Sequence, residues 1–597
     1  MKKVILFLFT VSVLCAQEIP RSEYPQPQFQ REQWLTLNGR WEFEFDDANV
    51  GFEQNWASGA KKFSRTILVP YCFESKLSGI ADTSFHPWVW YRRSFSVPDA
   101  WKGKRVLLNF GAVDYRSIVW VNGQRAASHT GGHVPFSIDV TPLLKAGPNV
   151  LTVRAEDPPT DRTVPRGKQY WEPQSEGIFY TRTTGIWQPV WLEAAGESYF
   201  EKVRITPSND GTVRFDAAIA RYQPGAEFHA VIRSGKDAVS SGMVRADERR
   251  VALALLVNEP KLWSVNAPNL YEVTFELRRG GAVVDRVQSY FGFRSVSTGN
   301  GRVLINGRPT YLKMLLDQGY WPESTLTPPT DEAIQYDIRI AKEMGFNGVR
   351  KHQKLEDPRF LYWADKMGFY VSDEMANAFE FDEDYVSRFT AEWIQVVDRD
   401  YNHPSVIMWV PINESWGVPN LLDSRQQNHL KALYTLTRSL DATRPVVDND
   451  GWEHVDTTDL FAMHDYARSG DLLYEKYKDL GKPGFRMPNV SRATLVPGYE
   501  YNGTPILLSE FGGIAYIPPG AQVPADAWGY SGVEKTPEAA LARLRGLYEA
   551  IAKIPAFAGV CYTQLTDVEQ EINGMLTYDR KPKFDVKAVR EINELLK

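Results

Sequence analysis

Two glutamates in this sequence follow apolar segments that are suited to be buried strands. Residues 406–412 are apolar and precede Asn413 and Glu414, and the apolar residues 506–508 precede Ser509 and Glu510. One such ending is most often a helix cap or a solvated loop, because Asn and Glu are common in both. Two such endings are more specific, since a pair of carboxylic acids that flank one bond is the machinery for cleaving a glycoside.

The elements that would position these carboxylates are strands that alternate with helices. From residue 310 onward, candidate strands lie near residues 311, 346, 370, 406, 445, 460, 506 and 558. Thr330 and Asp357 are suited to cap helices between them, and Gly368 to end the second of these helices. Such an alternation over about 300 residues predicts a (β/α)8 barrel, whose active site lies at the carboxyl ends of the strands.

The first half of the chain is predicted to be all-β. Residues 40–45, 117–121 and 271–277 alternate apolar and polar side chains, and the second of these segments runs into Asn122-Gly123, a strong hairpin signal. A second sandwich of about 100 residues fits the length of the later segment. The expected division is a first sandwich over 17–195, a second over 196–298 and the barrel over 299–597.

Composition excludes some classes of function. The chain has 597 residues, of which 43% are hydrophobic and 24% charged, as in soluble globular proteins. A net charge of −6 argues against a nucleic-acid partner, which would favour a basic chain. The 18 tryptophans suit either large cores or stacking on sugar rings. The sequence contains no cluster of Cys and His with the spacing of a zinc site, and no glycine-rich phosphate-binding loop. No metal or cofactor is therefore expected.

The N-terminus is predicted to be a signal peptide. Lys2 and Lys3 precede an apolar segment that is too short to span a bilayer, and no later segment is long enough. Cleavage after Ala16 would remove residues 1–16 and send the chain to the periplasm or outside the cell. Cys15 hints at a lipoprotein, but Leu14 before it is bulky for that cleavage.

The mature chain keeps two cysteines, Cys72 and Cys561. A disulfide between them is conceivable in an oxidising compartment, but their long separation in sequence favours two buried free thiols.

The sequence resembles glycoside hydrolase family 2, which includes β-galactosidases, β-glucuronidases and β-mannosidases. The most specific motifs are in the barrel, where residues 402–414 read NHPSVIMWVPINE, residues 509–512 read SEFG and residues 345–350 read GFNGVR. Weaker motifs lie earlier, at residues 37–41, 90–93, 184–188 and 292–294. The resemblance implies an N-terminal jelly-roll sugar-binding domain, an immunoglobulin-like sandwich and a C-terminal (β/α)8 TIM barrel.

The family pattern implies roles for five residues. Glu414 would be the general acid/base and Glu510 the nucleophile that forms a glycosyl-enzyme. Asn413 would hold the sugar 2-hydroxyl, and Tyr466 and Arg350 would lie beside the nucleophile. Tyr401 and Val410 depart from the acid/base signature. We expect the carboxyl groups about 5–5.5 Å apart, with the negative neighbour raising the pKa of Glu414.

Further substrate contacts are expected from residues at other strand ends. Residues 351–354 read KHQK, where the family usually has Ser-His-Tyr-Pro, so His352 is equally suited to bind sugar or to hold another side chain. Glu374 would either pair with Arg350 or touch the substrate. The remaining candidates are Asp317, Trp416, His464, Trp528 and Gln564, the two tryptophans being stacking platforms or plain core. Residues 165–171 form either a surface loop or a cover that shapes the pocket.

The expected activity is that of a retaining exo-β-glycosidase acting on a neutral sugar, with β-galactosidase as the leading candidate. β-Glucuronidases of the family carry an Asn-x-Lys element, whereas the corresponding stretch here has Glu571 and Asn573 and no lysine. A β-glucuronidase and a furanoside-specific enzyme remain alternatives. A non-catalytic carbohydrate-binding protein is a rival of another class, although both Glu414 and Glu510 are present. A homo-oligomer remains open.

Overall fold

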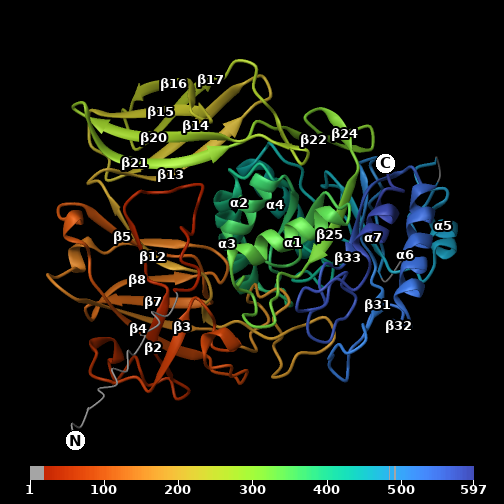
Figure 1. Ribbon diagram of the computed structural model, residues 1–597, viewed down its shortest axis with the longest axis horizontal. Helices are drawn as coiled ribbons and strands as arrows, with labels where there is room; N and C mark the ends of the chain where they lie inside the picture. The colour runs from red at the N-terminus through yellow and green to blue at the C-terminus, as the bar shows by residue number, and fades with distance from the viewer. Residues whose placement is uncertain (1–18, 483–484, 490–491) are drawn as a thin grey trace, which may run out of the picture.

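A computed structural model describes residues 19–482, 485–489 and 492–597. The predicted signal peptide, 1–16, and Cys15 lie outside these residues. Two β-rich parts lie side by side on the left of Figure 1, and the part that contains the helices lies on the right. In the described residues, no helix is both long and apolar enough to cross a membrane.

The first part is a sandwich of two antiparallel sheets. The six-stranded sheet consists of β3 (Arg65–Val69), β2 (Gly39–Phe45), β4 (Trp88–Phe95), β10 (Asn149–Glu156), β7 (Arg116–Val121) and β8 (Gln124–Thr130). The four-stranded sheet consists of β1 (Trp34–Thr36), β12 (Val190–Ala195), β5 (Arg105–Phe110) and β9 (Phe136–Asp139). Asn122 and Gly123 both have positive φ and join β7 to β8, which confirms the predicted hairpin.

The second part is a smaller sandwich. One sheet contains β13 (Tyr199–Pro207), β14 (Thr212–Ala220) and β17 (Arg250–Leu256). The other contains β16 (Asp237–Arg245), β15 (Ala226–Ser234), β20 (Tyr271–Arg279) and β21 (Ala282–Phe291). Alternate side chains of β20 are buried, among them Val273 and Phe275, so the predicted strand 271–277 is confirmed. A three-stranded sheet, β22 (Val296–Gly299), β23 (Arg302–Ile305) and β24 (Arg308–Thr310), leads into the third part.

The third part is built on a curled parallel sheet of seven strands. Their order is β28 (Val406–Val410), β27 (Tyr370–Glu374), β26 (Gly348–Lys351), β25 (Leu312–Asp317), β33 (Phe557–Thr563), β30 (Ile506–Gly512) and β29 (Phe461–Asp465). The strand expected near residue 445 is not formed. That segment makes only isolated pairings, Val446 with Trp409 and Asp450 with Asn413. Pro445 lacks a backbone donor and residues 448–450 are polar, so the gap between β28 and β29 is closed without a regular ladder.

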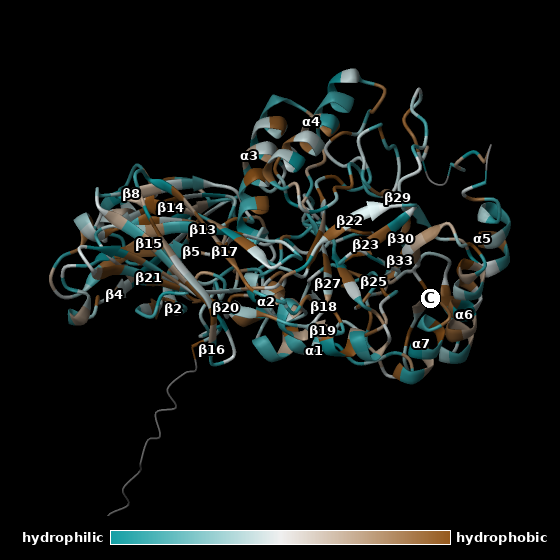
Figure 2. Cartoon of the chain, turned by 90° about the horizontal axis from the view of Figure 1, so that it is seen from above, coloured by the Kyte–Doolittle hydropathy of each residue, from teal (hydrophilic) through white to brown (hydrophobic). Residues whose placement is uncertain are grey.

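Helices surround this sheet, as Figure 2 shows. They are α1 (Asp331–Glu343), α2 (Pro358–Met367), α3 (Glu383–Asp400), α4 (Ser424–Leu440), α5 (Gly470–Tyr477), α6 (Pro537–Ala552) and α7 (Val586–Asn593). Thr330 caps α1 by accepting from the N–H of Ala333, and Asp357 caps α2 by accepting from that of Arg359. Gly368 ends α2 with φ 71°, so these predicted helix ends are confirmed.

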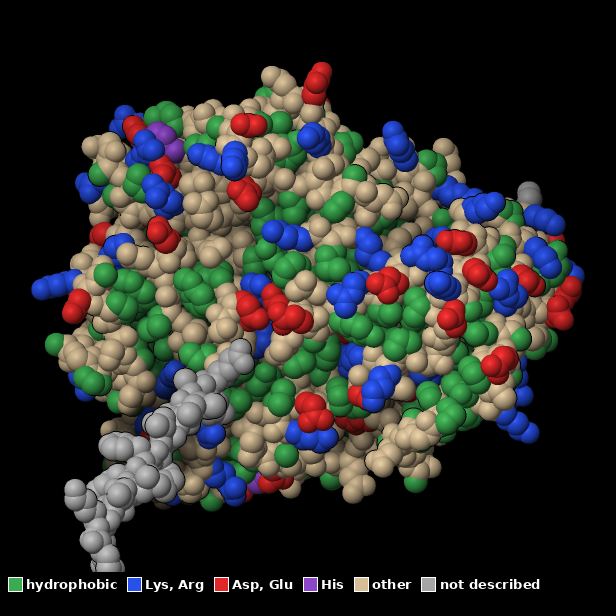
Figure 3. Space-filling view, in the orientation of Figure 1, with side chains coloured by type: hydrophobic (Ala, Val, Ile, Leu, Met, Phe, Trp, Pro, Cys, Tyr) green, Lys and Arg blue, Asp and Glu red, His purple; other side chains and the backbone are tan. Residues whose placement is uncertain are grey.

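Both remaining cysteines are buried free thiols, as expected. Cys72 lies in the first part, where its Sγ is 3.1 Å from Thr325 Oγ1 of the third part, and Cys561 lies in β33. On the face shown in Figure 3, acidic and basic side chains are interspersed.

Candidate active site

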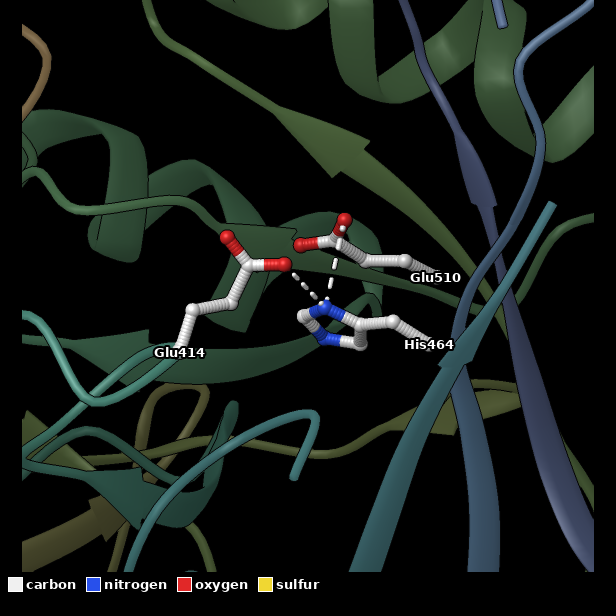
Figure 4. Close-up of side chains that lie close together, drawn as sticks. All are labelled: Glu414, His464 and Glu510. Atoms are coloured by element: carbon white, nitrogen blue, oxygen red, sulfur yellow. Dashed lines mark hydrogen bonds and ion pairs between the residues drawn. The ribbon is translucent and has the colours of Figure 1, made fainter. Parts of the chain in front are cut away.

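The two glutamates meet at the carboxyl end of the parallel sheet. Glu414 follows β28, Glu510 lies in β30 and His464 lies in β29. One oxygen of each carboxylate and one nitrogen of His464 all lie within 4.8 Å of one another, and the two carboxylates converge on the imidazole in Figure 4. This spacing suits a retaining glycosidase, whose carboxyl groups are about 5–5.5 Å apart, better than the inverting arrangement of about 6.5–9.5 Å.

Arg350 organises the base of the site. It is 2% exposed, and its guanidinium donates to Glu510 Oε1 at 2.8 Å, to Glu374 Oε2 at 2.7 Å and to Asn413 Oδ1 at 2.6 Å. The hydroxyl of Tyr466 donates to the other oxygen of Glu510 at 2.6 Å. Glu510 is therefore held by two donors, one on each carboxylate oxygen, that fix its direction.

Asn413 has a free donor. Its backbone N–H donates to Asn377 Oδ1 at 2.7 Å, and its side-chain oxygen accepts from Arg350. Its Nδ2 is buried and has no hydrogen-bond partner among the described residues. Buried donors are normally paired, so this amide is suited to a hydroxyl of a bound sugar.

His464 links three carboxylates. Its Nδ1 is 2.8 Å from Glu414 Oε1 and 3.5 Å from Glu510 Oε2, and its Nε2 is 2.8 Å from Asp450 Oδ1. Burial lowers the pKa of His464, but Glu510, Asp450 and Glu414 outweigh burial and raise it to about 10. The imidazole is therefore a cation at neutral pH, and its N–H groups tie the three carboxylates together.

The charge of His464 changes the expectation for Glu414. Burial raises the pKa of Glu414, but the hydrogen bond and charge of His464, together with Lys168 and Arg350, hold it below its ordinary value. The sequence-based expectation of a raised pKa is wrong for this resting state, because it considered only the neighbouring carboxylate. The proton required of a general acid resides on the Glu414–His464 pair rather than on Glu414 alone.

The same three side chains are of the kinds that bind a cation, and their atoms are close enough for one. In this structure His464 lies between the two carboxylates, with its Nδ1 2.8 Å from Glu414 Oε1 and 3.5 Å from Glu510 Oε2, so the three side chains already interact with one another.

Replacing His464 tests this assignment. In His464→Gln the Glu414–His464 pair loses its cation. Whether a proton is available to the leaving group then depends on the pKa of Glu414 alone. The alkaline limb of kcat/KM should move from near pH 10 to about pH 6–7, the range of tuned catalytic glutamates. The measurement is kcat/KM between pH 5 and 10, with His229→Gln in the second sandwich as the control. An unchanged limb would contradict the shared proton.

Three other predicted residues lie beside groups other than the two glutamates. Asp317 accepts from the ammonium of Lys351 and from the N–H of Gly319, and it contacts neither glutamate. Glu374 pairs with Arg350, the structural alternative for this residue, and burial raises its pKa to about 7. His352 Nδ1 lies 3.1 Å from Glu374 Oε1, and burial lowers the pKa of His352 so far that it is neutral.

The predicted aromatic and amide contacts border the site. Trp416 lies in an aromatic group with Phe179 and Phe379, and its Nε1 has no hydrogen-bond partner among the described residues. Trp528 donates to Gly177 O and packs on Tyr530. Gln564 is buried, and its side-chain amide forms hydrogen bonds with Gln318 and Asn573. It therefore holds neighbouring side chains of the pocket wall in place.

Several residues at the site were not anticipated. Asp450 follows the irregular segment near 445, and its Oδ1 accepts from His464 and from the hydroxyl of Ser509. Tyr530 stacks on Tyr466 with ring centroids 3.5 Å apart. Lys168 comes from the loop 165–171 of the first sandwich, which the sequence left as either a surface loop or a cover of the pocket, without a role for Lys168 itself. A polar residue behind a strand-like segment is the signal that could have identified Asp450, whereas Tyr530 lies in a loop with no such signal.

Three segments match known family models. Residues 35–158 match the sugar binding domain of glycosyl hydrolases family 2, residues 198–294 match a further domain of glycosyl hydrolases family 2, and residues 296–597 match its TIM barrel domain. These matches follow the order of the three parts in the structure.

Individual relatives are more distant. The chain is 28% identical over 540 residues to the β-glucuronidase of Felis catus, covering 82% of this chain and 79% of that protein. It is 24% identical to the β-glucuronidase of Paenibacillus borealis, covering 93% and 96%. A β-glucuronidase of an uncultured Clostridium superposes with a TM-score of 0.76 at 22% identity, covering 95% of this chain and 98% of the other, which shows a shared fold.

Proposed function

Because this chain belongs to glycosyl hydrolases family 2 and is a glycoside hydrolase, we propose that it releases a terminal β-linked uronic acid with retention of configuration. The observation that carries the proposed reaction is the pair Glu414 and Glu510, of which one oxygen each lies within 4.8 Å of the other. Arg350 and Tyr466 donate hydrogen bonds to Glu510 and not to Glu414. The two carboxylates are thus chemically distinct, as double displacement requires.

The first step breaks the glycosidic bond. The carboxylate of Glu510, oriented by Arg350 and Tyr466, attacks the anomeric carbon and forms an ester with the sugar. The leaving oxygen takes a proton from Glu414, which receives it from the pair that it forms with His464. Asn413 Nδ2 donates to the 2-hydroxyl, a contact that strengthens as positive charge develops on the sugar ring.

The second step releases the sugar. Glu414 is now anionic and takes a proton from water, and the oxygen of that water attacks the anomeric carbon from the side that the aglycone has left. The ester bond to Glu510 breaks and its electron pair returns to the carboxylate. Two inversions at one carbon give net retention.

A uronic acid replaces the neutral sugar that the sequence favours. The relatives named above are β-glucuronidases, and none of them supports the expectation of a β-galactosidase. The sequence argument against a uronate depends on Glu571. Its two oxygens accept from Tyr180 at 2.5 Å and Asn573 at 3.0 Å, so this carboxylate is occupied within the protein. That pairing weakens the argument from repulsion and supports the uronide alternative.

A substrate panel tests the proposal. We expect 4-nitrophenyl β-D-glucuronide to be hydrolysed with a higher kcat/KM than the corresponding β-galactoside and β-glucoside. Proton NMR of the first product formed should show the β-anomer. Preference for a neutral glycoside would restore the β-galactosidase hypothesis, and turnover of no glycoside would favour a binding protein.

A further inference from the structure

A loop of the first sandwich lies on the barrel beside the site. The N–H groups of Arg166 and Gly167 donate to the carbonyl oxygen of Asn377 at 3.1 and 2.9 Å. A Cβ on Gly167 would lie 2.2 Å from the carbonyl oxygen of Gln353, and its φ is +62°. Only glycine permits so close an approach in this conformation. The loop 165–171 therefore reaches the barrel, which answers the question that the sequence left open.

Asn377, which holds the loop 165–171, also contacts Asn413 beside the catalytic Glu414. The carbonyl of Asn377 holds the loop, and the side-chain oxygen of Asn377 accepts from the N–H of Asn413. The carbonyl of Lys168 accepts from the N–H of Tyr180, whose hydroxyl donates to Glu571. Lys168 is thus fixed on both sides against residues of the pocket.

Lys168 differs from the other buried lysines. Four lysines in the described part of the chain are buried: Lys168, Lys351, Lys354 and Lys583. The ammonium groups of three of them lie within 3.0 Å of a carboxylate. Lys351 contacts both Asp317 and Glu356. Lys354 contacts Glu356, and Lys583 contacts Asp567. Lys168 is 5% exposed, yet its ammonium has no ion-pair or hydrogen-bond partner among the described residues.

This ammonium lies over the ring of Phe179, 5.7 Å from the ring centroid. Its charge nevertheless reaches the site, since it contributes to lowering the pKa of Glu414 and of His352 and opposes the rise that burial causes in the pKa of Glu571. A lysine that is mostly buried and has no anion beside its ammonium offers a place for an anionic ligand, because a charge-assisted hydrogen bond there would meet no competing carboxylate.

We propose that Lys168 binds the carboxylate of the uronic acid, so that the first sandwich supplies the charge selectivity of the barrel's active site. This inference rests on the proposed function. A uronic acid differs from its parent sugar only at C6, where a carboxylate replaces a hydroxymethyl group. One ammonium that meets C6 therefore distinguishes the two classes, and residues 571–573 supply no cation that could do so.

The test compares substrates that differ in charge. Lys168→Met keeps the length and apolar stem and removes the charge. It should lower kcat/KM for 4-nitrophenyl β-D-glucuronide by about 10- to 100-fold, mainly through KM, as expected for a hydrogen bond between charged groups. The β-glucoside presents no charge to Lys168, so its kcat/KM should fall by much less than that of the glucuronide. The ratio of the two kcat/KM values therefore reports the lost contact with the carboxylate apart from the effect of Lys168 on the pKa of Glu414, which both substrates share. Lys102→Met, at an exposed site of the same sandwich, is the control.

The methyl ester of the same glucuronide removes the charge from the other partner. For the wild type, kcat/KM should be lower for the ester than for the acid by a similar factor. Lys168→Met should hydrolyse the acid and the ester with nearly equal kcat/KM. Additive losses would overturn the assignment, as would an equal fall for acid and glucoside. Should Lys168→Met fail to fold, Lys168→Gln carries the same comparison.

The outcomes separate the two proposals. If the wild type prefers neutral glycosides, the proposed uronide activity fails, and the role of Lys168 fails with it. If the wild type prefers the uronide and Lys168→Met retains that preference, only the role of Lys168 is overturned.

Discussion

Glu510→Ala should lower kcat by about 10⁴-fold or more on the best nitrophenyl β-glycoside, while leaving the fold intact. The loss is large because the carboxylate forms the covalent intermediate, and variants that lack a nucleophile retain only the catalysis of the remaining site. Glu549→Ala, on the exposed face of α6, is the control and should keep full activity.

Azide distinguishes the role of Glu510 from that of Glu414. In Glu510→Ala, azide can enter the space of the lost carboxylate, attack the anomeric carbon once and give the α-glycosyl azide. In Glu414→Ala, Glu510 still forms the ester and azide then gives the β-glycosyl azide. Products with the opposite anomers would exchange the two roles, and full activity of Glu510→Ala would exclude the double displacement.

The parts of the fold that sequence predicts are those fixed by local chemistry. Thr330 and Asp357 cap helices because a side-chain oxygen two or three residues before a free N–H can accept from it in any context. Asn122 and Gly123 form a hairpin because both tolerate positive φ. The two glutamates follow from the same logic, since each comes at the end of an apolar strand.

The rest depends on contacts between residues that are distant in sequence. Residue 445 begins an apolar segment but sits between β28 and β29, where only two isolated pairings form. The charge of His464 is set by carboxylates from three other segments, so the pKa of Glu414 could not be judged from one neighbour. Lys168 reaches the site only because Gly167 lets its loop touch the barrel.

Arg350→Ala should destabilise the barrel more than any surface change. The guanidinium is the shared partner of Glu374, Glu510 and Asn413, and all of them are buried. Removing one partner of a buried pair leaves an uncompensated charge and costs about 3–5 kcal/mol. The measurement is the urea midpoint of tryptophan fluorescence at pH 8. Arg214→Ala, which breaks an exposed pair with Asp216, is the control and should cost about 1 kcal/mol or less.

The loss in Arg350→Ala should also shrink in acid. Burial raises the pKa of Glu374 to about 7 even though Arg350 opposes this shift, so the pKa rises further without the arginine. A carboxyl whose folded pKa exceeds its unfolded value binds protons more tightly in the fold, so its effect on stability becomes less favourable as pH rises through that interval. At pH 5 Glu374 in the variant is neutral and needs no cation. The stability difference from wild type should therefore be smaller at pH 5 than at pH 8, and an equal difference at both pH values would mean that Arg350 acts through packing rather than through charge.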